Sequence, residues 1–197
     1  MMRKVICLMS ALLLSGMIMG CTESKTSDPV QEIPPPTSDS SMVTNDKATA
    51  QDEQKALDMS LEYKKKELTV DYADYEDTLT VEGLLAKGET MKPFLTEKNY
   101  EAYMANRYAT LPLMVADKEK ALLHPENILV EIKESKNDWI LVEYRLNLVF
   151  TDREGKQLKN IPLSGDITFL QDQGEWRIQD DTYNIKDLQN IVYEAKE

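Results

Sequence analysis

Apolar residues recur at two different spacings along this chain, and the change between them predicts the order of its elements. Up to about residue 113 they return every three, four or seven positions, which is typical of amphipathic helices. From Asn127 onward apolar and polar residues alternate, which is typical of half-buried strands. The pattern therefore predicts helices first and a sheet afterwards.

The first predicted helix spans residues 45–68. Its apolar stripe, at spacings of four and seven, consists of Leu57, Leu61 and Leu68, with Ala50 near the same line. The other faces carry Lys, Glu and Gln, so we expect them to face solvent. Asn45 or Asp46 is the expected N-cap.

Two further helices are predicted before the sheet. The segment 80–94 is expected to bury Leu84, Leu85 and Met91. The segment 95–108 has Thr96 as its expected N-cap and Glu97 in its first turn, where a negative charge is favourable. The sequence Leu111-Pro112-Leu113 is expected to end this helix.

The alternating part of the chain predicts four strands and then a short C-terminal helix. The clearest strand has an expected inward face of Ile140, Val142, Tyr144, Leu146, Leu148 and Phe150. Turns are expected around Gly155 and at Gln173-Gly174. Pro162 indicates a sheet edge or a bulge. The last helix has an apolar stripe of Ile185, Leu188 and Val192.

Helices and strands that are segregated along the chain indicate an α+β fold, with helices on one face of an antiparallel sheet. Over residues 48–183 this order resembles the cystatin-like or nuclear-transport-factor-2-like superfamily. The residues that carry the resemblance are Gly174-Glu175-Trp176-Arg177-Ile178, similar to a last-strand Gly-x-Trp-[Lys/Arg]-Ile, and the predicted helix "YEAYMANRY" at 100–108. The resemblance implies a bent four-stranded sheet with a cavity beneath it. It implies no single function, because the superfamily hosts enzymes, binding modules and assembly domains.

The N-terminal residues have a different character. Arg3 and Lys4 precede an apolar run of about 15 residues, whereas a membrane-spanning helix needs about 20, so we interpret residues 1–20 as a cleaved signal peptide. The run ends at Ile18-Met19-Gly20-Cys21, which resembles the lipobox of bacterial lipoproteins. The resemblance implies that Cys21 begins the mature protein and carries a diacylglycerol thioether. Two acyl chains hold a protein stably on a membrane, here on the extracytoplasmic face of the cell membrane.

Composition separates a tether from a single domain. Residues 21–45 are rich in Ser, Thr, Asp and Pro and have no apolar period, so we predict a disordered tether followed by one domain over 46–197. Without residues 1–20 the chain has 21 basic and 35 acidic residues, a formal charge of −14, which argues against a nucleic-acid partner. Cys7 leaves with the signal peptide and Cys21 is acylated, so the predicted domain has neither a free thiol nor a disulfide.

No catalytic, cofactor or metal site is expected. His124, the only histidine, lies in a predicted loop and is interpreted as a surface residue. The acidic stretch 71–82 lacks the ligands and the glycine of a calcium loop. Asp180-Asp181 are adjacent in a strand and point to opposite faces. No G-x-S-x-G setting surrounds the three candidate nucleophiles, Ser60, Ser135 and Ser164.

The tyrosines leave two functions open. Their apolar rings and polar tips suit a ligand site in the implied cavity, and the alternative is that they pack in the core. We therefore expect either a non-enzymatic interaction or assembly domain with an unknown protein partner, or a binding module for a small apolar or amphipathic molecule. The tyrosines concerned are Tyr63, Tyr72, Tyr75, Tyr100, Tyr103, Tyr108 and Tyr144.

One surface is predicted as an interface. Trp139 and Leu141 are expected on the outward face of the second strand, with Val149, opposite the helices. Two large apolar residues at one strand end are a candidate anchor for a protein partner, because aromatic residues dominate interface centres. The alternative is that the chain's own loops or its C-terminal helix cover Trp139.

Overall fold

A computed structural model of the chain describes residues 47–71, 80–106 and 108–193. The predicted signal peptide, Cys21, the predicted tether, Tyr72 and Tyr75 lie outside these residues. The elements in chain order are α1 (Ala50–Leu68), α3 (Val81–Met91), the 3₁₀ turn η1 (Lys92–Phe94), α4 (Glu97–Ala105), the 3₁₀ turn η2 (Tyr108–Thr110), α5 (Leu111–Glu119), β1 (Leu122–Ser135), β2 (Trp139–Thr151), β3 (Gln157–Asp172), β4 (Glu175–Tyr183) and α6 (Lys186–Tyr193).

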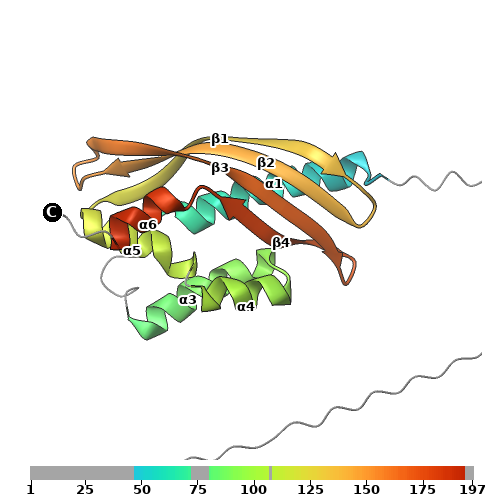
Figure 1. Cartoon of the computed structure of the whole chain (residues 1–197), viewed down its shortest axis with the longest axis horizontal. Helices are drawn as coiled ribbons and strands as arrows, with labels where there is room; N and C mark the ends of the chain where they lie inside the picture. The colour runs from blue at the N-terminus through green and yellow to red at the C-terminus, as the bar shows by residue number, and fades with distance from the viewer. Residues whose placement is uncertain (1–46, 72–79, 107, 194–197) are drawn as a thin grey trace, which may run out of the picture. The chain divides into compact units, whose positions relative to one another are not determined.

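The strands form one open antiparallel sheet in the order β1-β2-β3-β4. The sheet is bent, and the helices lie on one side of it, with α1 against β1, β2 and β4 (Figure 1). This arrangement confirms the predicted α+β fold with a short C-terminal helix. Within the described residues, no helix is both long and apolar enough to cross a membrane.

The inward face of β2 is the centre of the core, as its alternation predicts. All six expected inward residues, from Ile140 to Phe150, are at most 4% exposed. Each such side chain contributes about 1.5–3 kcal/mol by leaving water. Val149 points to the other face and is nevertheless buried. Its cross-strand neighbours are His124 on β1 and Asn160 on β3.

Helix α1 buries a different face from the predicted one. Leu68 is buried as predicted, but Leu57 and Leu61 are only half-buried and Ala50 is exposed, so the leucine stripe predicted burial only in part. The fully buried face instead consists of Ala56, Ser60, Tyr63, Lys64, Glu67 and Leu68. The pattern misled because polar side chains can be buried when they find partners, and the partners of this face come from the sheet. The helix begins at Ala50 with Thr49 as its N-cap, in a capping box with Asp52, whereas Asn45 and Asp46 lie outside the described residues.

Helix α3 corrects a second burial prediction. Met91 is buried and Leu84 is half-buried, as expected, but Leu85 is 54% exposed. Gly88 is buried and α4 comes very close to it, so that a Cβ atom at this position would collide with the Sδ atom of Met104. Helix α4 begins as predicted, with the Thr96 hydroxyl accepting a hydrogen bond from the backbone N–H of Asn99.

Two segments have a different local structure from the predicted one. Leu111-Pro112-Leu113 begins helix α5 rather than ending a helix. Proline is well tolerated there, because the backbone N–H groups of a first helical turn make no hydrogen bond within the helix and the N–H that proline lacks is not needed. His124 lies in strand β1 and not in a loop, and it pairs in register with Val149. Pro162 fits its prediction, because β4 pairs with β3 only from Gly165 to Asp172 and leaves Pro162 on an edge.

Candidate functional site

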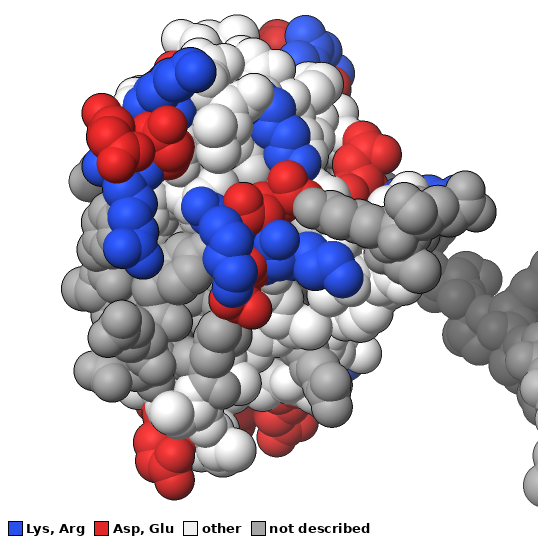
Figure 2. Space-filling view, turned by 90° about the vertical axis from the view of Figure 1, so that its left-hand side faces the viewer, with Lys and Arg blue, Asp and Glu red and all other residues white. Residues whose placement is uncertain are grey.

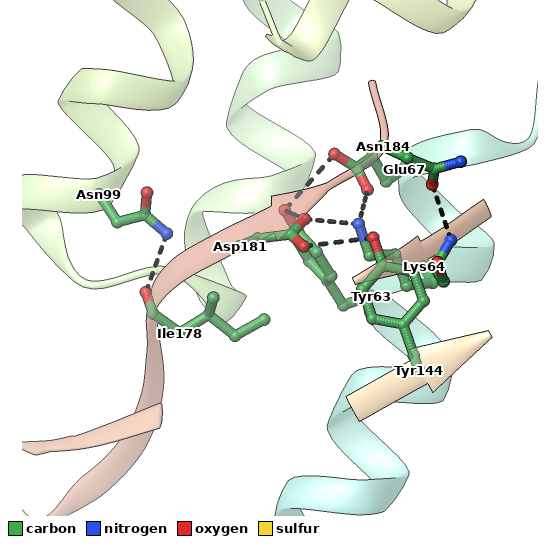
Figure 3. Close-up of polar contacts among 9 residues, drawn as sticks. Tyr63, Lys64, Glu67, Asn99, Tyr144, Ile178, Asp181 and Asn184 are labelled. Atoms are coloured by element: carbon green, nitrogen blue, oxygen red, sulfur yellow. Dashed lines mark hydrogen bonds and ion pairs between the residues drawn. The ribbon is translucent and has the colours of Figure 1, made fainter. Parts of the chain in front are cut away.

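The site begins with a charged side chain that the fold encloses completely. Lys64, near the end of α1, has no exposed surface. Its ammonium donates to the Glu67 carboxylate at 2.8 Å and to the Asp181 carboxylate of β4 at 2.5 Å (Figure 3). Its Nζ atom also lies 4.4–5.1 Å from the ring centroids of Tyr63, Tyr144 and Tyr183. Two carboxylates and three aromatic faces therefore replace the water that an exposed lysine would have.

A β-bulge in β4 brings Asp181 to this position. Phe169 of β3 pairs with Ile178, but its neighbour Thr168 pairs with Asp180, so β4 has one extra residue here. Trp176 and Ile178 face the core before the bulge, and strict alternation would then turn Asp180 inward. The extra residue reverses the alternation, so that Asp181 points to Lys64.

The charges in this cluster shift one another's proton affinities. Burial alone would lower the pKa of the Lys64 ammonium, but the Asp181 and Glu67 carboxylates outweigh burial and raise that pKa above its usual value. Burial raises the pKa of Glu67 to about 7, and the nearby Asp181 charge acts in the same direction while Lys64 opposes it. Lys64 is thus held as a cation and cannot serve as a neutral amine nucleophile.

The tyrosine hydroxyls complete the cluster. The Tyr63 hydroxyl donates to Asp181 at 3.1 Å, and the Tyr144 hydroxyl donates to the same carboxylate at 3.4 Å. Burial, reinforced by the charges of Glu67 and Asp181, raises the pKa of Tyr63 well above its usual value, so its hydroxyl stays protonated. The Tyr183 hydroxyl is also buried, but it has no hydrogen-bond partner among the described residues.

A cavity of about 270 Å³ lies beside this cluster, between the last turn of α1, helix α4, η2 and β4. The residues that line it include Tyr63, Glu67, Tyr103, Tyr108, Asp181 and Tyr183. Side chains such as Tyr144 and Phe169 fill the core between the helices and the sheet.

Sequence reasoning found part of this site. Three of the tyrosines proposed to line a cavity do line it: Tyr63, Tyr103 and Tyr108. Tyr144 lies in the core instead. Tyr100 lies near the surface, where its hydroxyl donates to Glu89. Lys64, Glu67, Asp181 and Tyr183 were missed. Lys64 and Glu67 belong to the part of α1 that the sequence predicted to face solvent, and nothing in the neighbouring sequence marks them as buried.

The other candidate residues lie apart from the cavity. His124 is half-exposed, with its Nδ1 atom 3.9 Å from the Asp71 carboxylate. Ser60 is buried and donates to the Ala56 carbonyl, Ser135 donates to Glu53, and Ser164 is exposed on β3. In the part of the chain that the structure describes, no group of three or more His, Cys, Asp or Glu side chains is placed to hold a metal ion.

Trp139 and Leu141 are half-buried residues at the start of β2. They alternate with the buried Ile140 and Val142, so they belong to the sheet face opposite the helices. The Nζ atom of Lys136 lies 4.9 Å from the centroid of the Trp139 ring. Neither residue belongs to the core, and their role as an interface stays a prediction.

Charges on the surface are mixed in sign. Figure 2 shows one face of the molecule, where Lys and Arg side chains lie next to Asp and Glu. Ion pairs of this kind include Lys159 with Glu119 at 2.9 Å and Lys133 with Glu143 at 2.6 Å. Such exposed pairs are worth little for stability, at most about 1 kcal/mol each.

Comparison with known proteins shows a likeness in fold alone. No protein-family model and no curated protein matches the chain. Among solved structures it is similar to one described as a periplasmic fragment of TraM, with a TM-score of 0.50 and 10% sequence identity, over 66% of this chain and 96% of that one. The lipobox and the cystatin-like resemblance stay predictions.

Proposed function

We propose that the protein is a lipid-anchored domain on the extracytoplasmic face of the cell membrane that acts by binding or assembling with other proteins, without enzymatic activity. The observation that carries the location is the abrupt change from apolar to polar residues at Gly20-Cys21. The likeness in fold to a fragment of a periplasmic protein is in keeping with it.

The interaction role is supported by the outward face of the sheet. Trp139 and Leu141 place a large aromatic and a large aliphatic side chain side by side on that face, and both are partly exposed. Half-buried aromatic side chains of this kind are frequent at the centres of protein interfaces. Crosslinking in intact cells, followed by identification of the protein attached to this face, would name the partner.

The lipid anchor is tested by exchanging one cysteine at a time. In the Cys21→Ala variant, labelling with palmitate should disappear and the protein should be released from the membrane, because no acyl chain remains to hold it. The matched control is Cys7→Ala, which changes the only other cysteine and should leave both labelling and retention intact. Membrane retention of Cys21→Ala at the wild-type level would refute the proposed anchor.

A second function, the binding of a small molecule, is favoured by the cavity. Four tyrosines, three of them anticipated from the sequence, line a space of about 270 Å³. A cavity of about 150 Å³ already admits benzene, so this one has room for a ligand of modest size. The two functions are compatible, since the cavity and Trp139 belong to opposite faces of the sheet.

A further inference from the structure

We propose that the cavity beside Lys64 binds a small organic cation, an ammonium group on a short apolar chain. The inference rests on the second function proposed above and names the class of its ligand. Three independent features of the cavity carry it: the balance of charge on its walls, an aromatic lining with one unused hydroxyl, and the direction of the helices that end there.

The walls carry more negative than positive charge. Glu67, Asp180 and Asp181 are among the described residues that line the cavity, and these described residues include no lysine or arginine. Lys64 lies behind this wall and pairs with both Glu67 and Asp181, so its single charge balances only one of them once Glu67 is ionised. An ammonium ligand would supply a second positive charge beside Glu67 and Asp181, whereas an anion would be repelled by them.

The aromatic lining suits a cation that is partly stripped of water. The rings of Tyr103 and Tyr108 are tilted by 49° to each other with centroids 6.4 Å apart, and Tyr63 and Tyr183 also line the cavity. Tyrosine faces attract cations, as the position of Lys64 over two of these rings, Tyr63 and Tyr183, already illustrates. The buried, unpartnered hydroxyl of Tyr183 offers an acceptor to a donor that is absent from the described residues.

Two helices end at the cavity, and both present the end that favours positive charge. Glu67 belongs to the last turn of α1, and Asn106 is the C-cap of α4. The C-terminal end of a helix carries the equivalent of about half a negative charge. The backbone thus reinforces the side-chain carboxylates at the same place.

The test compares three ligands that differ in charge and share a chain length: n-butylammonium, n-butanol and butyrate. Each is titrated into the full-length protein, in non-ionic detergent at constant ionic strength, and followed by amide NMR shifts. We expect n-butylammonium to saturate shifts at Asn106 and Thr182 and to bind at least about tenfold more tightly than n-butanol. Butyrate should produce no saturable shift.

The result also separates the two levels of the proposal. Equal affinity for n-butanol and n-butylammonium, or tighter binding of butyrate, would refute the cation class and leave small-molecule binding intact. No saturable shift with any of the three ligands would refute both the cation class and the binding function.

Variants at the cavity test where the ligand binds. Asp180 is exposed and lines the cavity, so Asp180→Asn should fold normally and weaken n-butylammonium about three- to fivefold. Asp138→Asn removes the same charge in the exposed β1–β2 turn and should leave the affinity unchanged. Tyr183→Phe keeps the ring and should weaken binding by removing the free hydroxyl. Equal effects of the two aspartate variants would show only general attraction to an acidic protein and would overturn the site.

Discussion

The two tryptophans of the chain illustrate how differently one residue type is used. Trp176 of β4 is 3% exposed, and its indole N–H donates to the Asp52 carboxylate of α1 at 2.8 Å. Trp139 of β2 is half-buried on the opposite face of the sheet and is approached by the Lys136 ammonium. The first side chain joins sheet to helix, and the second lies partly exposed on the sheet face away from the helices.

We therefore expect opposite results from the same substitution. Trp176→Ala should lower the free energy of unfolding by about 3–5 kcal/mol, because it leaves a cavity in the core and removes a hydrogen bond to the Asp52 carboxylate. Trp139→Ala should change it by less than about 1 kcal/mol and abolish self-association or capture of the partner. Urea unfolding and analytical ultracentrifugation measure the two effects. A loss of several kcal/mol in Trp139→Ala would mean that this side chain supports the fold and is not an interface anchor.

At the scale of elements, the contact of α1 with β4 is made by charge as well as by apolar packing. The Lys64 ammonium from the helix and the Asp181 carboxylate from the strand meet in the core, and Glu67 is a second acceptor. Buried ion pairs add little net stability, because removing charges from water is costly, but a broken pair is very unfavourable. The cluster therefore favours one register of α1 against β4 over alternatives that would leave a charge unpaired.

This account predicts a non-additive pair of variants. Lys64→Met should lower the free energy of unfolding by about 3–5 kcal/mol, because it leaves Glu67 and Asp181 buried without their cation. The triple variant Lys64→Met, Glu67→Leu, Asp181→Leu removes all three charges and should recover most or all of that loss. Urea unfolding at pH 7 gives both values. If the triple variant is as unstable as the single one, the charged cluster itself supplies net stability.

At the scale of the whole molecule, two kinds of shifted carboxyl group have opposite effects on stability. The pKa of Asp52 is lowered by hydrogen bonds from Thr49 and Trp176, and that of Glu53 by hydrogen bonds from Ser135 and Lys47. Such groups stabilise the fold at higher pH and lose that effect as pH falls through their folded pKa. Glu67 is the opposite case, because burial raises its pKa to about 7.

The expected pH profile follows from these signs. Stability should rise from strongly acidic pH to about pH 5, as the carboxylates of the first class ionise. Stability should then fall as pH rises through about 7. The reason is that an unfolded glutamate ionises near pH 4.3, whereas folded Glu67 keeps its proton to a higher pH. Urea unfolding across pH 3–9 measures the profile. Glu67→Gln should flatten the fall near neutrality, and an unchanged fall in that variant would assign it to other groups.

The sequence alone was sufficient where structure follows from local geometry. Alternation in β2 predicted every inward residue, because successive side chains of a strand must point to opposite faces. The cap at Thr96 and the turns at Gly155 and Gln173-Gly174 follow likewise from a few neighbouring residues, and both turn glycines have positive φ. The order of helices and strands was enough to predict the α+β class.

Only the tertiary structure decided which polar side chains are buried. Lys64 and Asp181 are 117 positions apart, so no local pattern distinguishes this lysine from the exposed ones on the same helix. The bulge that turns Asp181 inward depends on the pairing of β4 with β3, and it reverses the alternation that the sequence suggests. A charge enters the core only when partners from distant segments offset its loss of water, and those partners exist only once the chain has folded.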